Sequence, residues 1–394
     1  MRVLHLLGSL GMGGAERWLL ELLHYWHARG EGAPQFDFIA TSGERGRFDD
    51  EVRRLGSEVF YLPFKRSNLP HFTAEFRKIL RRGNYAAIHD HQAWVCGWHF
   101  LLGAGLLPPV RIAHAHNSAF ELEIIGPIRQ RLAHTGLRLI SLFATHIVAT
   151  SSDVLQDYGF TSPRFASIQR FPLHCAFDPA RFRGDRNLAK LALCAEFNWP
   201  SDSAIILVAG RLDPHVEEAH SHNWKNTSRA LAIGMECAQR QSRIRVLFAG
   251  ALSPAFAAYG ERIADAALSD RVIFAGVRQD IAALMLASDV LLFPSVVEGL
   301  GMVAVEAQAA GLPVLASDAV PRDCVVVPEL VHFRSLREST SAWADDVFAL
   351  MAMPRDTAMA NEHVANSPFA IAQSSSALAN IYTSVQTGSG GKVA

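Results

Sequence analysis

The sequence predicts an α/β protein with two doubly wound parallel sheets that face a central cleft. Short apolar strands alternate with turns and amphipathic helices along most of the chain, which is typical of parallel sheets wrapped by helices. This alternation stops over residues 171–203, where prolines and a glycine replace a clear strand pattern, and then restarts. The chain therefore divides into domains at 1–172 and 173–370. The segment 371–394 is expected to form a crossover helix and a flexible tail.

The N-terminal domain begins with an apolar strand at 2–7, which four glycines follow within the next seven residues. Tryptophans and leucines then recur at helical spacing over 18–26, which predicts an amphipathic helix. Further apolar runs predict the remaining strands at 36–41, 58–62, 86–91, 110–116 and 146–150.

The C-terminal domain repeats the same pattern. Its strands are predicted at 204–209, 244–249, 271–275, 290–294 and 313–317. Its helices are predicted at 226–238, 254–267, 281–287 and 302–310. Ligands of such sheets bind at the carboxyl ends of the strands, close to helix N-termini. We therefore expect the chemistry to lie in the loops that follow strands.

The composition excludes several classes of protein. Of the 394 residues, 49% are hydrophobic and 19% are charged, which argues against intrinsic disorder. The net charge of −1 argues against a protein that coats nucleic acid. The five cysteines form no CxxC pair, so neither a zinc knuckle nor a disulfide framework is expected. Neither a signal peptide nor an apolar run of about 18 residues is found, which predicts a cytoplasmic protein.

A glycine-rich turn, Gly11-Met-Gly-Gly-Ala-Glu16, follows the first strand. The backbone at Gly13 and Gly14 can approach a ligand closely, and the helix that follows directs its positive N-terminal end toward it. The dinucleotide pattern GxGxxG is not met, because Glu16 takes the place of the last glycine. A tight turn without any ligand contact is the alternative interpretation.

Two carboxylates flank a second glycine-rich turn. Glu298 precedes Gly299-Leu300-Gly301, and Glu306 follows within the predicted helix. We expect the two acids to share one side of the element, because eight residues make just over two helical turns. Glu298 can then reach a sugar hydroxyl, and Glu306 can accept hydrogen bonds from a ribose diol. Two solvated glutamates are the alternative, but the apolar surroundings of Glu306 disfavour it.

Two cations occur where the second domain begins. Arg211 follows the strand 204–209 directly after a glycine, and Lys225 opens the next helix. The guanidinium can bind two phosphate oxygens and the ammonium acts as a point charge, so together they can neutralise a departing diphosphate. Surface cations at the ends of a strand and a helix are the alternative interpretation.

Histidines gather at two strand ends and in one loop. His89 and His91 end one strand of the N-terminal domain, and His114 and His116 end the next. Polar groups at such positions can bind a ligand or transfer a proton. A second group occupies 215–222, but its spacing matches no zinc pattern, so no metal site is predicted.

The order of these motifs resembles that of the retaining glycosyltransferases of family 4, which have the GT-B fold. The motifs are GGAE, GR, KN, FAGVR and PSxxEGLGxxxxEAxAAGLPV, spread over residues 1–335. RIAHAHNS at 111–118 and SDAVPRD with VPELVHFRSL at 317–336 are similar to the branch that builds bacterial capsular and exopolysaccharides.

The resemblance implies two Rossmann-like domains, with the nucleotide-diphosphate sugar on the C-terminal domain and the acceptor on the N-terminal one. It implies that Glu306 holds the ribose, that Glu298 holds the donor sugar, and that Arg211 and Lys225 hold the diphosphate. The segment Gly299-Leu300-Gly301 lies between the two glutamates. The stretch 212–224 that separates the two cations is longer than is usual in the family.

Further contacts follow from the same resemblance. The backbone at Gly13 and Gly14 closes over the phosphates and the sugar, and His116 touches the sugar near its reactive carbon. Val277 and Arg278 lie where such enzymes hold the base. The family retains the anomeric configuration and needs no metal and no cofactor beyond the nucleotide sugar.

The expected partners are a nucleotide-sugar donor, with UDP as the commonest carrier, and a saccharide or lipid-linked saccharide acceptor. Basic residues at 77–82 beside Phe72 and Phe76 could make a peripheral contact with the cytoplasmic face of the inner membrane; a solvated basic helix face is the alternative interpretation. Three alternatives remain open: another GT-B reaction such as sugar-nucleotide epimerisation or phosphorolysis, a non-catalytic nucleotide-sugar binding protein, and an NAD-dependent oxidoreductase.

Overall fold

The computed structural model describes residues 1–11, 13–30, 32–120, 122, 126–216, 223–251 and 256–384. The chain forms two compact units. The first comprises Met1–Phe177 together with the C-terminal segment from Pro368, and the second comprises Asp178–Ser367. Each unit is an α/β sheet structure, and each is described by itself.

The first unit contains a seven-stranded parallel sheet in the order β3-β2-β1-β4-β5-β6-β7. Its strands are β1 (Arg2–Leu7), β2 (Gln35–Ala40), β3 (Val59–Tyr61), β4 (Ala87–Asp90), β5 (Val110–Ala115), β6 (His146–Ala149) and β7 (Gln169–Pro172). Its helices are α1 (Gly14–His27), α2 (Asp49–Arg54), α3 (Leu69–Gly83), α4 (Cys96–Gly103), α6 (Pro127–Phe143), α7 (Ser152–Asp157) and α15 (Ile371–Thr383).

The second unit contains a six-stranded parallel sheet in the order β10-β9-β8-β11-β12-β13. Its strands are β8 (Ala204–Ala209), β9 (Ile244–Ala249), β10 (Val272–Phe274), β11 (Val290–Phe293), β12 (Val314–Ser317) and β13 (Val331–Arg334). Its helices are α8 (Arg186–Glu196), α9 (Thr227–Arg240), α10 (Phe256–Asp265), α11 (Ile281–Ala287), α12 (Met302–Ala309), α13 (Thr340–Met351) and α14 (Thr357–Ala365).

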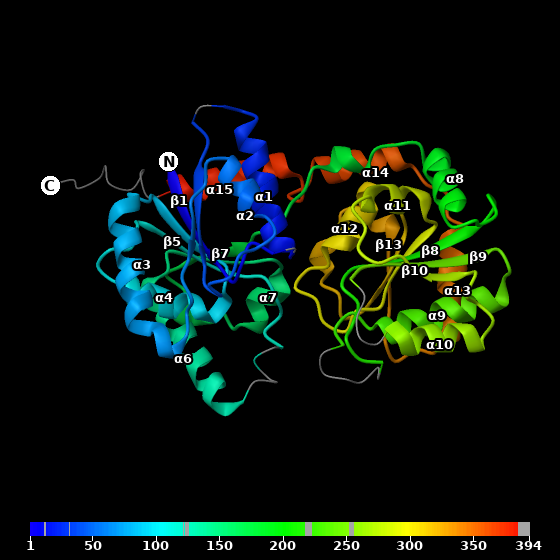
Figure 1. Ribbon diagram of the computed structural model, residues 1–394, viewed down its shortest axis with the longest axis horizontal. Helices are drawn as coiled ribbons and strands as arrows, with labels where there is room; N and C mark the ends of the chain where they lie inside the picture. The colour runs from blue at the N-terminus through cyan, green and yellow to red at the C-terminus, as the bar shows by residue number, and fades with distance from the viewer. Residues whose placement is uncertain are drawn as a thin grey trace. The chain divides into compact units, whose positions relative to one another are not determined.

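Both sheets are covered by helices on their two faces, so their central strands are buried throughout. In the second unit, α9, α10 and α13 lie on one face, and α8, α11, α12 and α14 lie on the other (Figure 1). The strand β8 consequently reads AIILVA and β11 reads VLLF, without polar alternation. This continuous apolar pattern is what made these strands predictable from the sequence.

The strand order reverses once in each sheet. In the first unit this switch lies between β1 and β4, and in the second between β8 and β11. The loops that leave the carboxyl ends of strands on either side of a switch diverge to opposite faces and leave room for a ligand. The turn that contains Gly13 follows β1, Arg211 follows β8, and Glu298 follows β11, so all three lie in loops beside a switch.

The last helix of the chain returns to the first unit. α15 packs against α1, as the red helix beside the blue one in Figure 1 shows. A parallel β-bridge between Phe177 and Ala370 joins the two segments in which the polypeptide leaves and re-enters this unit. The unit boundaries therefore fall at 177/178 and 367/368, a few residues from the expected 172/173 and 370/371. The expected flexible tail lies almost wholly at 385–394, outside the described residues.

The segment 171–203 is more regular than its sequence suggests. It contains the helix α8, of which Leu193 and Cys194 are buried whereas Leu188 and Leu191 are exposed. Because part of its apolar set faces solvent, α8 lacks the apolar stripe that identifies a core-facing helix. The edge strands β7 and β13 were also missed, since their sequences QRFP and VHFR mix polar with apolar residues and form no apolar run.

Within the described part of the chain, no helix is both long and apolar enough to cross a membrane. The membrane face expected on α3 needs correction, because Phe72 and Phe76 are fully buried in the core. Arg77 is also engaged: its Nη1 donates to the carbonyl oxygens of Leu102 and Ala104, at 3.1 and 2.9 Å. The basic stretch of α3 thus holds α4 in place with one of its arginines.

Candidate active site

An ion pair joins the two sides of the switch in the second unit. Lys225 Nζ lies 2.5 Å from Glu298 Oε1, and the carboxylate side chain is only 8% exposed whereas the lysine side chain is 31% exposed. The ammonium also lies 5.9 Å from the centre of the Phe293 ring. The structure therefore brings together two residues that the sequence analysis assigned separately to the diphosphate and to the donor sugar.

The buried carboxylate of Asp213 fixes Lys225. Its Oδ1 accepts the backbone N–H of Lys225 at 3.0 Å, and its Oδ2 accepts that of Thr227 at 2.8 Å. Thr227 Oγ1 in turn accepts the N–H of Asp213. These bonds satisfy the first N–H group of α9, that of Thr227, and the N–H of Lys225 just before the helix, although Asp213 is not the residue that precedes α9. Sequence reasoning missed Asp213, and its position two residues after Arg211 was the available signal.

Arg211 lies at the start of the same loop. It is exposed, and we find no ion pair for it among the described residues. Its backbone follows Gly210, whose φ is +136°, where the chain turns out of β8. The neighbouring turn after β9 packs so closely that a Cβ at Gly250 would lie 1.8 Å from the Gly210 carbonyl oxygen. The two glycines thus fix the path of the backbone from which the Arg211 side chain extends.

The loop after β11 is held against the loop that carries Lys225. The N–H of Val296 donates to the Trp224 carbonyl oxygen at 2.7 Å. The loop ends at Gly301, which has a φ of +90° and immediately precedes α12. A Cβ there would lie 2.9 Å from the Phe293 ring, so both the backbone conformation and the space require glycine. The residue at the N-cap of α12 is Gly301, which has no side chain to cap the helix, and the N-terminal N–H groups of a helix can bind an anion.

Glu306 lies on α12, just over one turn after the start of the helix that Gly301 precedes. It is half-buried, together with Met302 and Val303, whereas the other face of the helix is packed into the core. Residues at this spacing form one accessible stripe along a helix. Glu298 precedes the helix by four residues, so the helical spacing that we expected to align the two acids does not apply to it. Gly299 and Leu300 lie in the connecting turn, and Leu300 is buried.

Val277 and Arg278 follow β10, as expected. Val277 is 50% exposed. The Arg278 guanidinium, in contrast, binds two carboxylates: Nε lies 2.8 Å from Asp280 Oδ1, and Nη2 lies 3.0 Å from Glu196 Oε2. These two hydrogen-bonded carboxylates raise the pKa of Arg278 further above its ordinary value. The side chain of Arg278 is therefore engaged by Asp280 and by Glu196 of α8. Val277 is the exposed member of the pair.

In the first unit, the turn after β1 leads into α1 at Gly13 and Gly14. The Glu16 carboxylate folds back over this turn, so a Cβ at Gly13 would lie 2.2 Å from Glu16 Oε2. Burial raises the pKa of Glu16, and a backbone hydrogen bond acts in the opposite direction. Both glycines are exposed. Their backbone is therefore accessible, with a carboxylate beside it that occupies the place of the third glycine of a dinucleotide loop.

Histidines from three neighbouring strands lie together in this unit. β1 pairs with β4 so that His5 is opposite His89, and residues two apart on a strand face the same side. His89 and His91 consequently meet His114 and His116 on the adjoining strand end. Asp90 faces the other way, where its Oδ2 lies 2.6 Å from Nδ1 of a histidine on α4, His99.

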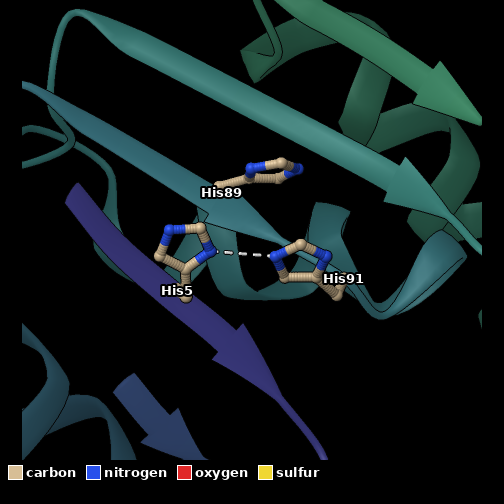
Figure 2. Close-up of side chains that lie close together, drawn as sticks. All are labelled: His5, His89 and His91. Carbon is tan, nitrogen blue, oxygen red and sulfur yellow. Dashed lines mark hydrogen bonds between the residues drawn. The ribbon is translucent and has the colours of Figure 1, made fainter. Parts of the chain in front are cut away.

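The five imidazoles contact one another through ring nitrogens (Figure 2 shows three of them). His5 Nδ1 lies 2.9 Å from His91 Nε2, as the dashed line marks, and His91 Nδ1 lies 2.8 Å from His116 Nε2. His89 Nε2 lies 3.1 Å from His114 Nδ1. His89 also stacks on His91, with ring centroids 4.2 Å apart. By distance alone, two triplets of these imidazoles could hold a metal ion: His5, His89 and His91, or His91, His114 and His116.

The cluster is enclosed by residues that sequence reasoning did not connect with it. Trp18 of α1 meets four of the rings edge-on and donates its Nε1–H to Ser374 Oγ at 3.0 Å. Tyr382 of α15 lies 2.9 Å from His89 Nδ1 through its hydroxyl. Cys175 Sγ lies 3.9 Å from His116 Nδ1. No sequence signal relates residues so far apart along the chain.

Burial keeps these histidines neutral. It lowers the pKa of His5 and of His116 to about 3. For His89, His91 and His114, burial and the neighbouring imidazoles lower the pKa well below its ordinary value. A neutral imidazole has one N–H donor and one acceptor nitrogen. The cluster can therefore donate or accept hydrogen bonds, but it carries no positive charge near pH 7.

The His- and Glu-rich insertion between Arg211 and Lys225 is described only in part. Residues 217–222, which contain most of the group for which we predicted no metal site, lie outside the described residues. His215 and Asn223 flank this stretch, and Asn223 Nδ2 donates to the His215 carbonyl oxygen at 2.8 Å. The ends of the insertion are thus joined to each other.

Two family models match the chain, one in each unit. Glycosyltransferase Family 4 matches residues 12–161, and Glycosyl transferases group 1 matches residues 192–355. The second match contains all the candidate residues of the second unit from Arg211 to Glu306. The first contains the glycine turn and the histidines at the ends of β4 and β5.

Curated relatives and solved structures agree with these matches. A putative glycosyltransferase EpsF of Bacillus subtilis is 28% identical over 97% of this chain and 96% of its own length. The capsular polysaccharide biosynthesis glycosyltransferase CapH of Staphylococcus aureus is 28% identical over 39% of this chain and 41% of its own. A structure of Anabaena HepE in complex with UDP has a TM-score of 0.74 at 19% identity and covers 98% of this chain and 100% of its own.

Proposed function

The chain belongs to the family 4 glycosyltransferases with the GT-B fold, and we propose that it transfers a sugar from a UDP-sugar to a saccharide or lipid-linked saccharide acceptor. The acceptor would belong to surface polysaccharide synthesis. This part of the proposal is supported by CapH, whose name refers to capsular polysaccharide biosynthesis. UDP as carrier is supported by the HepE structures, which contain UDP or UDP-glucose.

The observation that carries the proposal is the pairing of Lys225 with Glu298 at the switch of the second sheet. A diphosphate placed at the uncapped N-terminus of α12 is attracted by that helix end and by the ammonium. As the phosphate draws Lys225 toward itself, the Glu298 carboxylate becomes able to accept a sugar hydroxyl. Arg211, at the end of β8, supplies a second cation for the leaving phosphate.

We propose that the reaction retains the anomeric configuration and uses neither a metal nor a further cofactor. In this proposal the acceptor attacks the face of the sugar from which the diphosphate departs, and a phosphate oxygen takes the acceptor's proton. The C1–O bond to the phosphate breaks while the bond from the acceptor oxygen to C1 forms. The protein contributes position and charge stabilisation. His116, neutral because of burial, contacts the donor sugar.

Proton NMR of the reaction mixture tests this proposal. With a UDP-sugar and an extract of lipid-linked acceptors, we expect a glycoside whose anomeric coupling matches that of the donor. Excess EDTA should leave the rate unchanged. A product of inverted configuration, or a rate that EDTA abolishes and a divalent cation restores, would contradict the proposed mechanism. Interconversion of sugar nucleotides without an acceptor would favour the epimerase alternative.

Helix α6 is a better candidate for peripheral membrane contact than α3. It exposes Ile128 and Leu142, at 75% and 74%, and Leu132 at 44%. Its sequence, PIRQRLAHTGLRLISLF, has three arginines and no acidic residue. An exposed face that combines apolar and cationic side chains matches an anionic lipid surface. We propose that α6 lies on the cytoplasmic face of the membrane and brings the enzyme to lipid-linked acceptors.

Vesicle sedimentation tests the role of α6. The double variant Arg131→Glu/Arg138→Glu is expected to lower the fraction bound to vesicles containing anionic lipid about tenfold or more, because each basic residue near such a surface contributes about 1 kcal/mol. Lys78→Glu with Arg82→Glu on α3 is the matched control and should have the smaller effect. Equal losses in both pairs, or binding that does not depend on lipid charge, would contradict the assignment to α6.

A further inference from the structure

We propose that His5, His91 and His116 form one hydrogen-bonded chain, and that this chain holds His116 in the tautomer with its proton on Nδ1. The links are His5 Nδ1 to His91 Nε2 at 2.9 Å and His91 Nδ1 to His116 Nε2 at 2.8 Å. Both are ordinary hydrogen-bond distances. The chain runs from β1 through the end of β4 to the end of β5, and its first link is drawn in Figure 2.

The geometry couples the tautomers of the three rings. Each ring is neutral, since burial lowers all three pKa values, and therefore has one N–H and one lone pair. Each link joins an Nδ1 to an Nε2 and needs one proton. If His5 has its proton on Nδ1, then His91 and His116 must also have theirs on Nδ1. If His116 has its proton on Nε2, so must the other two. His5 thus decides the hydrogen-bonding character of a residue two rings away.

The two ends of the chain favour the Nδ1–H form. At one end, His5 Nε2 is buried and has no hydrogen-bond partner in the part of the chain that the structure describes. Its ring packs on Phe36, with centroids 4.0 Å apart. A proton on this nitrogen would be a buried donor without an acceptor, which costs the desolvation of that group. Leaving the proton on Nδ1 avoids placing a donor there.

The other end attracts an N–H. His116 Nδ1 lies 3.9 Å from Cys175 Sγ, a thiol that is only a weak donor and a weak acceptor, so this contact alone does not fix the tautomer. Burial raises the pKa of Cys175 to about 12, and the Glu16 carboxylate contributes to this rise, so a negative charge acts on this end of the chain. The hydrogen of an N–H dipole is favoured near that charge. His116 Nδ1 is the ring nitrogen that is not hydrogen-bonded to another imidazole, and we therefore assign it as a donor.

A metal ion fits this arrangement less well than shared protons do. Tetrahedral zinc binds imidazole nitrogens at about 2.0–2.1 Å, which places them about 3.3 Å or more from one another. The linked nitrogens here are 2.8 and 2.9 Å apart. His89, the third member of one candidate triplet, stacks on His91 with an interplanar angle of 26°, so its in-plane lone pairs do not converge with those of its neighbour.

The consequence for catalysis rests on the proposed contact between His116 and the donor sugar. In the Nδ1–H form His116 offers a hydrogen bond to an oxygen of the donor, and it cannot act there as a general base. His5 and His91 are then positioning residues, because they act through His116 and need not touch the substrate.

Nitrogen-15 NMR of the full chain, labelled at histidine, tests the proposal directly. The two ring nitrogens have distinct shifts with and without a proton, and the His116 signals are assigned by their loss in His116→Gln. We expect all three histidines of the chain to show the Nδ1–H form, which is the minor one for free imidazole in water. The Nε2–H form at His116, or different tautomers at His5 and His91, would overturn the assignment. So would stoichiometric binding of Co²⁺ that removes these signals.

Three variants test the coupling. His5→Phe removes both ring nitrogens and is expected to release His116 into a mixture of tautomers. His5→Asn places an amide N–H where Nδ1 was and should preserve the Nδ1–H form. His146 is another buried strand histidine, but it is not one of the three hydrogen-bonded imidazoles. The substitution His146→Asn should therefore change nothing at His116. An unchanged tautomer in His5→Phe would contradict the coupling; should that variant fail to fold, the wild-type and His5→Asn spectra still decide.

Kinetics separate this inference from the proposed function. In His5→Phe, kcat is expected to fall by the same factor as the Nδ1–H fraction of His116, with little change in KM for the nucleotide sugar, and His5→Asn should restore it. If the tautomer shifts while kcat does not, the chain exists but the proposed role of His116 in transfer is wrong. If the tautomer of His116 does not shift, the proposed coupling through the hydrogen-bonded imidazoles is wrong, whether or not the activity changes.

Discussion

Replacing Lys225 with alanine is expected to lower kcat/KM about a hundredfold to a thousandfold, the usual effect of removing one group that stabilises charge in a transition state. Lys225 is held beside the switch of the second sheet by the ion pair of its Nζ with Glu298 and by the hydrogen bond that its backbone N–H donates to Asp213 Oδ1. In the proposed reaction the negative charge grows on the departing diphosphate. Initial rates with a UDP-sugar measure the loss.

The fold should survive this substitution. The Lys225 side chain is 31% exposed, so in the variant water can enter beside the Glu298 carboxylate, which is 8% exposed in the pair, and we expect a loss of about 1 kcal/mol of stability. Thermal unfolding of Lys225→Ala is therefore expected to lie within a few degrees of the wild type. A large loss of stability would mean that the lower rate reports unfolding.

Lys190 provides a matched control within the same unit. Its Nζ lies 2.8 Å from Asp289 Oδ2, with side-chain exposures of 17% and 9%, so it forms an ion pair of the same kind. Asp289 immediately precedes β11, and the pair thus lies at the amino end of the sheet, away from the switch loops. Lys190→Ala should leave kcat/KM unchanged. An equal fall in both variants would show that the lysine at 225 supports the sheet and not the reaction.

The central strands could be predicted almost to the residue because the two sheets bury them on both faces. β1, β8 and β9 begin and end where the apolar runs do. In parallel sheets that are buried on both faces, most positions of a strand have an apolar side chain, so a nearly continuous apolar run marks the strand. The exposed leucines of α8 and the four-residue edge strands β7 and β13 break this relation. They form because neighbouring elements hold them, which a sequence pattern does not record.

The candidate site was predictable in its parts but not in its connections. Glu298, Lys225 and the turn at Gly301 could be recognised from residue type and from their place after strands. The ion pair between the first two requires β8 to lie beside β11, although two strands intervene in the sequence. The same holds for the histidine chain, whose links depend on β1 lying next to β4. Strand order, and not local pattern, places these side chains within reach of one another.

Glu306→Ala is expected to weaken nucleotide binding, and not turnover alone. Glu306 lies on the accessible stripe of α12, just over one turn beyond the N-terminus that we assign to the diphosphate. A carboxylate that accepts both hydroxyls of a ribose makes two charge-assisted hydrogen bonds, each contributing about 1.5–3 kcal/mol. Losing both should weaken binding about a hundredfold or more. Glu306→Gln keeps the shape and one good acceptor, so its loss should be intermediate.

A thermal-shift panel of UDP, GDP, ADP and NAD measures this loss. A ligand at 100 times its dissociation constant stabilises the wild type by about 2.7 kcal/mol, and a hundredfold weaker site leaves about 0.4 kcal/mol at the same concentration. Glu236→Ala, which removes a partly exposed carboxylate from α9, is the control and should keep the full shift. A shift with UDP that Glu306→Ala removes would support the donor site and identify the base. Stabilisation by NAD alone would favour an oxidoreductase.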